Sequence, residues 1–145
     1  MIVVDVNLLL YAVITGFPHH AVVREWWEKK LNARVEVGLA APALFGFLRL
    51  STNPRVLTSP LPVEDAIGYV RQWLERPHVR FLLPGPRHLD IAFELLRALG
   101  TAGNLTTDVQ LAAFAIEYQA QLHSNDTDFG RFPQVQWVNP LTPRT

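Results

Sequence analysis

Four aspartates stand at the boundaries of the helices and strands that this sequence predicts. Asp5 closes the apolar run Ile2–Val4, and Asp108 opens a helix. Asp126 and Asp128 follow a short strand near the end of the chain. Acids so far apart can serve one site only if the fold returns the chain to one edge. We expect the fold to gather them into one anionic pocket that holds a hard divalent cation.

The alternation of strands and helices predicts the fold class. Short apolar runs are interpreted as strands at residues 2–5, 34–40, 79–83, 121–124 and 136–138. The connections between them are too long for hairpins and contain helices, which indicates an α/β fold with a parallel sheet covered on both faces. Ligands of such sheets collect at the carboxyl ends of the strands, where Asp5 and Asp126 stand.

Proline, glycine and asparagine mark the expected helix ends. Pro18, Pro42 and Pro62 suit the first turns of three helices, since the fixed φ of proline is compatible with helix starts. Asn7 is a candidate cap for the first helix, and Gly100 ends a helix over residues 88–99.

Length and composition limit the class of protein. A chain of 145 residues with 49% hydrophobic residues fits one packed domain, here residues 1–145 with a tail from about residue 140. The absence of cysteine excludes disulfides and thiolate metal sites. No apolar run is long enough to span a bilayer, and no basic region precedes the first apolar run. We therefore expect a soluble, cytoplasmic protein with no membrane partner.

The charge distribution favours a polyanionic substrate. The 13 acids balance the 13 bases, but setting the four aspartates aside leaves nine acids and a net charge of +4. Eleven of the bases are arginine, whose planar group suits phosphate oxygens.

Four carboxylates in one pocket repel one another unless a cation neutralises them, and Mg²⁺ or Mn²⁺ fits carboxylate oxygens. Such an ion activates water for phosphodiester hydrolysis. Asn7, Thr107, Ser124 and Asn125 are expected to hold the carboxylates by hydrogen bonds. Arg49 is expected at the rim of the site, with an ordinary surface salt bridge as the alternative.

A family resemblance rests on several motifs in matching order. They are I-V-V-D-V-N at residues 2–7, T-D at 107–108 leading into L-A-A at 111–113, and S-N-D-T-D-F at 124–129. The segments G-F-L-R-L-S-T-N-P-R-V at 46–56 and W-V-N-P-L at 137–141 add to them. Together they resemble the PIN-domain ribonucleases, and most closely the VapC toxins of bacterial toxin–antitoxin pairs.

The resemblance implies a three-layer α/β/α PIN fold with a five-stranded parallel sheet, and Mg²⁺- or Mn²⁺-dependent cleavage of RNA. It also implies a homodimer and a cognate VapB-type antitoxin. The family's first aspartate matches Asp5, its central metal-binding aspartate matches Asp108, and its late acidic pair matches Asp126 and Asp128. The implied metal ligands are Asp5, Asp108 and Asp126, with Asp128 in support.

One position departs from the family pattern. Most PIN domains place a glutamate in the helix after the second strand, but the expected helix over residues 43–50 has no acid. Phe47 stands at the position where that glutamate would be expected. The nearest glutamate, Glu36, lies in the preceding strand. This departure leaves a second function open, a catalytically weak PIN-like module that binds RNA or protein.

The acids also have structural interpretations. Asp5 can cap the first helix, and Asp108 in a first helical turn is favoured by the helix dipole alone. Asp126 and Asp128 also suit a turn. Glu117 is nine residues beyond Asp108, about half a rotation away on the same helix, so we do not expect it to share the metal.

Trp26, Trp27 and Trp73 are expected in the core or in an isologous homodimer interface. A haloacid-dehalogenase-like phosphatase also places an aspartate after its first strand. That chemistry needs an acid where Asn7 stands and a late lysine, whereas the only lysines are at positions 29 and 30.

Overall fold

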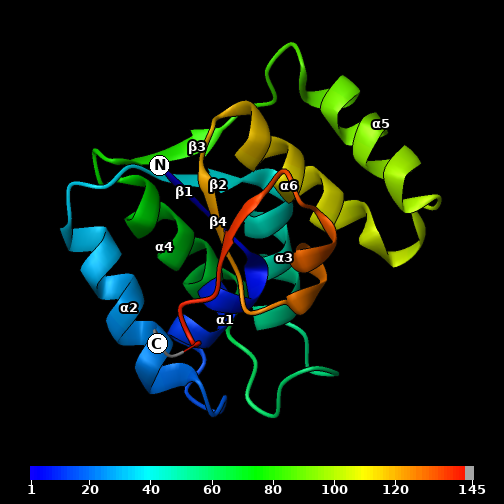
Figure 1. Ribbon diagram of the computed structural model, residues 1–145. Helices are drawn as coiled ribbons and strands as arrows, with labels where there is room; N and C mark the ends of the chain where they lie inside the picture. The colour runs from blue at the N-terminus through cyan, green and yellow to red at the C-terminus, as the bar shows by residue number, and fades with distance from the viewer. Residues whose placement is uncertain (143–145) are drawn as a thin grey trace.

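A computed structural model describes residues 1–142 and shows one five-stranded parallel sheet (Figure 1). Its strands are β1 (Ile2–Val4), β2 (Val37–Ala40), β3 (Val79–Leu82), β4 (Gln121–His123) and β5 (Gln136–Val138). All neighbours pair in parallel, in the order β3-β2-β1-β4-β5. The predicted α/β fold is confirmed, although the first four strands are one to three residues shorter than expected.

Six α-helices surround the sheet. They are α1 (Val6–Val13), α2 (His20–Asn32), α3 (Ala41–Ser51), α4 (Val63–Leu74), α5 (His88–Leu99) and α6 (Thr106–Glu117). There are also two short 3₁₀ helices in residues 1–142. The first, Gly103–Leu105, directly precedes α6, and the second, Thr127–Arg131, follows β4. Helix α6 packs on β1, β4 and α3, and α5 packs on the outside of α6 (Figure 1).

The central strand β1 sets the position of the first aspartate. All three of its residues are buried, as expected for a strand covered on both faces, which explains its unbroken apolar run. Val4 pairs with His123, and the backbone N–H of Asp5 donates to the His123 carbonyl at 3.0 Å. Asp5 therefore leaves the sheet beside the end of β4, where Ser124 begins the next turn.

The tryptophan cluster belongs to the core. Trp27 and Trp73 are buried and meet edge to face at 5.6 Å between ring centroids. Trp26 is half-buried and stacks on His123 at 5.7 Å. An interface built on Trp27 and Trp73 is therefore excluded, because these rings are already covered by the molecule itself.

Glu36 and Asp5 lie at opposite ends of the strands. It precedes β2 rather than lying in the strand, and its carbonyl accepts from the N–H of Ile2, the first residue of β1. Its carboxylate faces Arg80 at 3.9 Å. Glu36 thus sits at the amino ends of the strands and cannot replace a missing acid at the carboxyl ends.

Within residues 1–142, no helix is both long enough and apolar enough to cross a membrane.

Candidate metal centre

Three aspartates from three separate parts of the chain meet at the carboxyl edge of the sheet. Asp5 follows β1, Asp108 lies in the first turn of α6, and Asp126 follows β4. One carboxylate oxygen from each lies within 4.8 Å of those from the other two. The expected convergence of Asp5, Asp108 and Asp126 is therefore present.

The Asp5 carboxylate is held on both oxygens. Oδ1 accepts from the N–H of Val6 at 2.7 Å, and Oδ2 accepts from Ser124 Oγ at 2.7 Å and from Asn7 Nδ2 at 3.1 Å. Asp5 is thus the cap of α1, and the prediction that Asn7 fills that role is wrong, because Asn7 lies inside the first turn. Capping and a place in the acidic cluster are compatible, since the two oxygens have different partners.

Ser124 is the hub of the hydrogen-bond network. Its fully buried hydroxyl donates to Asp5 and accepts from Asn7 Nδ2 at 3.2 Å and from the N–H of Asp126 at 2.9 Å. Asn7 in turn accepts from the N–H of Asn125 at 3.2 Å. One hydroxyl therefore fixes Asp5 and the backbone of Asp126 relative to each other, as the sequence predicted for hydroxyl and amide neighbours.

Two residues at the end of β5 support the same turn and were not predicted to belong to the site. Trp137 Nε1 donates to the Ser124 carbonyl at 3.0 Å, and Asn139 Nδ2 donates to Asn125 Oδ1 at 3.1 Å. The sequence contained a signal for Asn139, because this residue directly follows a strand of the parallel sheet, and Asn125 follows β4 by only two residues.

Asp108 is strongly perturbed by its surroundings. Burial in the first place, and then repulsion from Asp126, Asp5 and Asp128, raises the pKa of Asp108 to about 7. Among the described residues, none donates a hydrogen bond to its carboxylate. Its charged form is therefore opposed by the apolar surroundings and by the other acids, and no hydrogen bond from residues 1–142 offsets that cost.

Asp5 responds to the same surroundings. Burial raises the pKa of Asp5 above its usual range, and repulsion from Asp126 adds to the increase. The hydrogen bonds from Ser124, Val6 and Asn7 act in the opposite direction, because they stabilise the carboxylate. A centre in which two acids resist ionisation is one that a divalent cation would stabilise strongly.

The remaining predicted residues lie at the margin. The Asp128 N–H donates to Asp126 Oδ1 at 2.9 Å, but the Asp128 carboxylate turns to Arg131 at 3.6 Å. Thr107 is exposed beside Asp108, and Arg49 is exposed on α3. Within residues 1–142 Arg49 forms no ion pair, so the salt-bridge alternative for it is not seen.

Phe47 is not the empty acidic slot that the sequence suggested. Its ring is fully buried and lies 5.0 Å from that of Trp73, so it points into the core. The α3 residue that meets the first turn of α1 is Gly46, where an added Cβ would lie 2.6 Å from Val6 Cγ2. Helix α3 therefore packs closely on Val6, the residue that follows Asp5.

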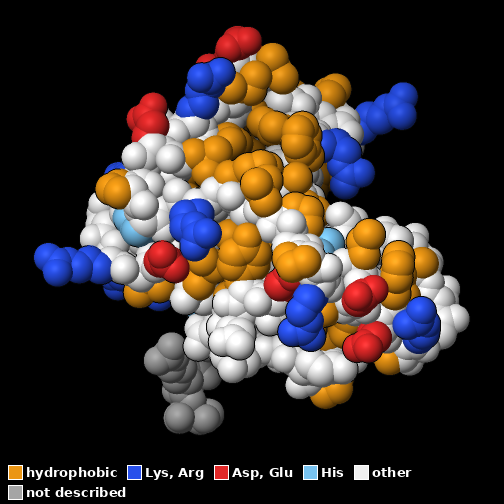
Figure 2. Space-filling view, turned by 90° about the horizontal axis from the view of Figure 1, so that it is seen from above, with side chains coloured by type: hydrophobic (Ala, Val, Ile, Leu, Met, Phe, Trp, Pro, Cys, Tyr) orange, Lys and Arg blue, Asp and Glu red, His pale blue; other side chains and the backbone are white. Residues whose placement is uncertain are grey.

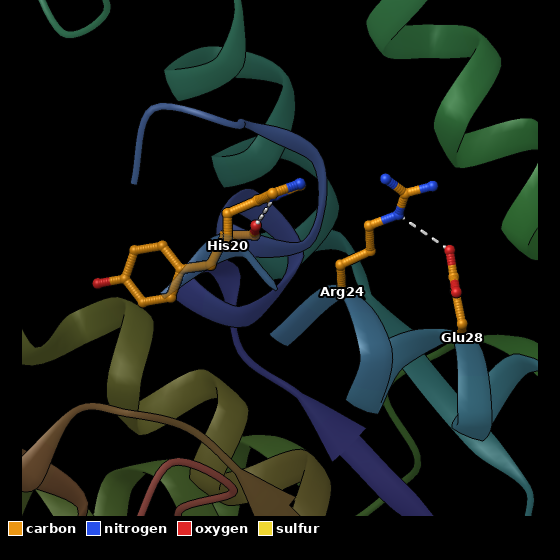
Figure 3. Close-up of polar contacts among 4 residues, drawn as sticks. His20, Arg24 and Glu28 are labelled. Carbon is orange, nitrogen blue, oxygen red and sulfur yellow. Dashed lines mark hydrogen bonds and ion pairs between the residues drawn. The ribbon is translucent and has the colours of Figure 1, made fainter. Parts of the chain in front are cut away.

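A large surface groove, with a volume of about 640 Å³, lies elsewhere and is lined by residues of α1, α2 and α4. Three of its polar side chains are already paired, since Arg24 Nε donates to Glu28 at 3.0 Å and His20 Nδ1 hydrogen-bonds to the Tyr11 carbonyl at 2.8 Å (Figure 3). None of the three clustered aspartates lines it. The unbalanced charge is at the aspartates, which are therefore the better candidate for chemistry.

The aspartate cluster fits a hard divalent cation. All three donors are carboxylate oxygens, the ligand type that Mg²⁺ and Mn²⁺ prefer. Oxygens bound to opposite sides of Mg²⁺ are roughly 4.2 Å apart, twice the metal–oxygen distance. The separations of up to 4.8 Å are close to this value, so small side-chain rotations would complete a site.

Comparison with known proteins gives a consistent result. The family model described as "PIN domain" matches residues 2–135. The chain is 60% identical to Ribonuclease VapC33 of Mycobacterium tuberculosis over 141 residues, 97% of this chain and 99% of the relative. It is 42% identical to Ribonuclease VapC37 of the same species, over 97% of each chain.

Solved structures share the fold at low sequence identity. VapBC2 from Rickettsia felis, bound to a DNA fragment from its promoter, superposes with a TM-score of 0.69 at 20% identity, over 96% of this chain and 98% of the other. Mycobacterium tuberculosis VapC20, a toxin that cleaves the sarcin-ricin loop, superposes with a TM-score of 0.67 at 18% identity, over 97% and 100%.

Proposed function

Since the chain belongs to the PIN-domain family and its relatives are VapC ribonucleases, we propose that it is a metal-dependent endoribonuclease toxin. The observation that carries the proposal is the cluster of three aspartate oxygens within 4.8 Å of one another. We further propose that residues 1–145 form one PIN domain, of which the last three residues lie outside the described part, and that it acts in the cytoplasm.

Asp5, Asp108 and Asp126 are the proposed ligands of Mg²⁺ or Mn²⁺. A bound ion of this kind supplies an activated water and polarises the phosphodiester. The raised pKa values of Asp5 and Asp108 support this assignment, because burial and the neighbouring acids disfavour the charged form of both carboxyl groups, which a bound cation would favour. Asp128 supports the site through its N–H, which orients Asp126.

The other residues act by positioning. Ser124 and Asn7 hold Asp5 in one rotamer, and the Ser124 hydroxyl also fixes the backbone of Asp126. Asn125 ties the turn to Asn7. A ligand held in place before the ion arrives loses less conformational freedom on binding, so this network should raise metal affinity.

RNA is the proposed substrate. Arg49 offers an exposed guanidinium without an acidic partner among residues 1–142, and Thr107 exposes a hydroxyl next to Asp108. Both groups suit phosphate oxygens. We propose that they contact the RNA backbone beside the metal ligands.

A VapB-type antitoxin and a second copy of this chain are the proposed partners. Similar structures include VapBC complexes from Rickettsia felis and from nontypeable Haemophilus influenzae. These complexes pair a VapC protein with a VapB protein, which supports the same kind of partner here.

The experiment measures cleavage of labelled structured RNA by metal-stripped protein to which Mg²⁺ is returned. Asp5→Asn and Asp108→Asn should lower the rate on the order of 10³-fold, because each removes a charged ligand. Asp65→Asn is the matched control, since Asp65 is an exposed acid in the first turn of α4. Its rate should equal that of the wild type.

A titration with Mn²⁺ provides a readout besides activity. Both ligand variants should bind Mn²⁺ more weakly, while Asp65→Asn should not. Undiminished Mg²⁺-dependent cleavage by Asp108→Asn would contradict the proposal. Wild-type protein that binds RNA but does not cut it in Mg²⁺ or Mn²⁺ would favour the alternative, a PIN-like binding module. The observation that supports this alternative is the lack of an acid on α3.

A further inference from the structure

Three asparagines connect the carboxyl ends of three neighbouring strands. Asn139 directly follows β5, Asn125 follows β4 by two residues, and Asn7 lies in the first turn of α1, just beyond β1. These strands are adjacent in the sheet, in the order β1-β4-β5. Asn139 Nδ2 donates to Asn125 Oδ1 at 3.1 Å, and the N–H of Asn125 donates to Asn7 Oδ1 at 3.2 Å. We call these three residues the asparagine bridge.

The bridge ends at two of the proposed metal ligands. Asn7 Nδ2 donates to Asp5 Oδ2 at 3.1 Å and to Ser124 Oγ at 3.2 Å. The same Ser124 oxygen accepts from the N–H of Asp126 at 2.9 Å. The position of Asn139 is therefore transmitted across the edge of the sheet to the carboxylate of Asp5 and to the backbone of Asp126.

A backbone N–H fixes the direction of two amides in the bridge. Since an N–H can only donate, the atom of Asn139 that faces the N–H of Leu141 at 3.0 Å is the oxygen. The NH₂ group of Asn139 is then the group that faces Asn125. In the same way, the N–H of Asn125 faces the oxygen of Asn7, which directs the Asn7 NH₂ group to Asp5. Each amide therefore has one orientation that satisfies all of its neighbours.

The far end of the bridge is itself held in place. Leu141, whose N–H bonds to Asn139, packs against the hydrophobic core, and Pro140 between them has a fixed φ. Strand β5 also contacts the turn after β4 a second time, because Trp137 Nε1 donates to the Ser124 carbonyl at 3.0 Å. Asn139 is thus a fixed point from which the bridge extends.

The amino ends of the strands are joined differently. There the N–H of Ile2 donates to the Glu36 carbonyl at 2.9 Å, and the N–H of Gln121 donates to the Met1 carbonyl at 3.1 Å. The Glu36 side chain meets Arg80 only at 3.9 Å, and both are exposed. Figure 2 shows this end of the molecule, with charged side chains spread among hydrophobic ones. Backbone bonds hold the strands together at this end, so the bridge is a feature of the edge where the aspartates meet.

We propose that Asn139 is a positioning residue of the metal centre, which acts through Asn125 and Asn7 to hold Asp5 and Asp126 at the spacing that a divalent cation needs. The inference rests on the proposed function and extends the site to the segment beyond β5. Carboxylates without an ion repel one another, so side chains free to turn would move apart. A bridge that prevents this movement reduces the conformational freedom lost when the ion binds, and so raises the affinity.

Titration of the metal-stripped full chain with Mn²⁺ tests the proposal. Asn139→Ala should bind Mn²⁺ about tenfold more weakly, the low end of the range for residues that orient metal ligands. Asn53→Ala is the matched control. Asn53 is also half-buried and followed by a proline, and its Oδ1 also accepts from the N–H two residues on, Arg55, at 2.9 Å. It lies beyond the far end of α3, away from the aspartates.

The two variants should differ in metal affinity but not in stability. Urea unfolding in chelator should show similar losses for both, because each loses the same kind of local turn, while Asn53→Ala should bind Mn²⁺ as the wild type does. Wild-type affinity in Asn139→Ala would overturn the proposal. So would an equal weakening in Asn53→Ala, since metal affinity would then follow stability alone.

A double variant tests whether Asn139 acts through Asn125. Asn125→Ala removes the acceptor of the Asn139 amide, so adding Asn139→Ala to it should weaken Mn²⁺ binding little further. Losses that add in full would overturn the bridge. Hydrogen exchange provides a readout without metal. The N–H of Asn125 should exchange faster in Asn139→Ala than in the wild type and in Asn53→Ala, and an unchanged rate would also overturn the bridge.

RNA cleavage by the same samples separates this inference from the proposed function. Asn139→Ala should cleave more slowly at limiting Mn²⁺, and about tenfold more Mn²⁺ should restore the wild-type rate, because affinity alone has changed. If the wild type binds Mn²⁺ more tightly than Asn139→Ala but does not cleave RNA, the bridge stands and the nuclease is removed. If the wild type cleaves RNA and Asn139→Ala matches it in rate and in Mn²⁺ affinity, the nuclease stands and the bridge is removed.

Discussion

Helix α6 carries a carboxylate near each end, and the two have opposite surroundings. Asp108 in the first turn faces Asp5 and Asp126, and its pKa is raised to about 7. Glu117 at the last residue accepts two backbone hydrogen bonds at 2.8 Å. Asp108 is therefore near other carboxylates, whereas Glu117 has hydrogen-bond donors from the backbone.

The difference separates two roles that a half-buried acid can have. Glu117 stabilises the folded state, because its charge is matched by donors that would otherwise be unpaired. Asp108 destabilises the folded state whenever it is ionised, and a fold keeps such a group only if something outside the chain compensates it. The helix dipole favours Asp108 at its position, but the dipole alone does not hold its pKa in the usual range.

The largest effect should come from removing the Glu117 carboxylate, whose hydrogen bonds to the backbone are made within the chain. Glu117→Ala removes both bonds to the Gly85 and Arg87 N–H groups and should lower the free energy of unfolding by about 3 kcal/mol. Urea unfolding in the presence of a chelator measures it. Glu25→Ala is the control, since Glu25 forms an exposed pair with Lys29 at 3.2 Å and should cost less than about 1 kcal/mol. Equal losses in the two variants would contradict a stabilising role for the two hydrogen bonds that Glu117 accepts.

A divalent cation should stabilise the protein only through the Asp108 end of α6. Mn²⁺ at about 100 times its dissociation constant should raise the free energy of unfolding of the wild type by about 2.7 kcal/mol. Asp108→Asn should lose most of this gain, because a ligand is missing. Glu117→Gln should keep all of it, although that variant starts from a lower stability. A gain in Asp108→Asn equal to that of the wild type would mean that the ion binds elsewhere.

The smallest effect is the pH dependence of the metal-free protein. The pKa of Asp108 is raised to about 7 in the folded state, well above its value of about 3.9 in the unfolded chain. Between these values the folded state binds more protons than the unfolded state, so stability falls as pH rises from about 4 to about 7. Below pH 4 and above pH 8 the contribution of Asp108 is constant.

Thermal unfolding in chelator measures this contribution as the difference between the wild type and Asp108→Asn. The variant should be more stable above pH 7, by up to about 1 kcal/mol because Asp108 is only half-buried and water screens it. The advantage should disappear as pH falls toward 4. A difference that does not change with pH would show that Asp108 does not titrate in this range.

Much of the fold and the place of the candidate site follow from the sequence. Apolar runs bounded by acids specify the strands, because a parallel sheet buries both faces and exposes only its edges. Since carboxyl ends of parallel strands share one edge, the acids after β1 and β4 had to be close. Asp108 joins them because α6 packs on both of these strands.

Side-chain direction is what the sequence did not provide. Phe47 and Gly46 are neighbours on α3, yet one enters the core and the other meets α1, and a phase error of one residue exchanges them. Asn7 and Asp5 both suit a cap, and only the exact start of α1 decides between them. The tryptophans were equally compatible with core and interface, and only the structure shows Trp27 and Trp73 buried against each other.

The order in which the acids occur along the chain has a consequence during synthesis. Asp5 is made first, but its partner strand β4 and its hydrogen-bond donor Ser124 come almost 120 residues later. A ribosome-bound chain that has not yet released β4 therefore has no assembled centre. The proposed ribonuclease would thus stay inert during translation until the segment that contains β4 and Ser124 has been made and has folded onto β1.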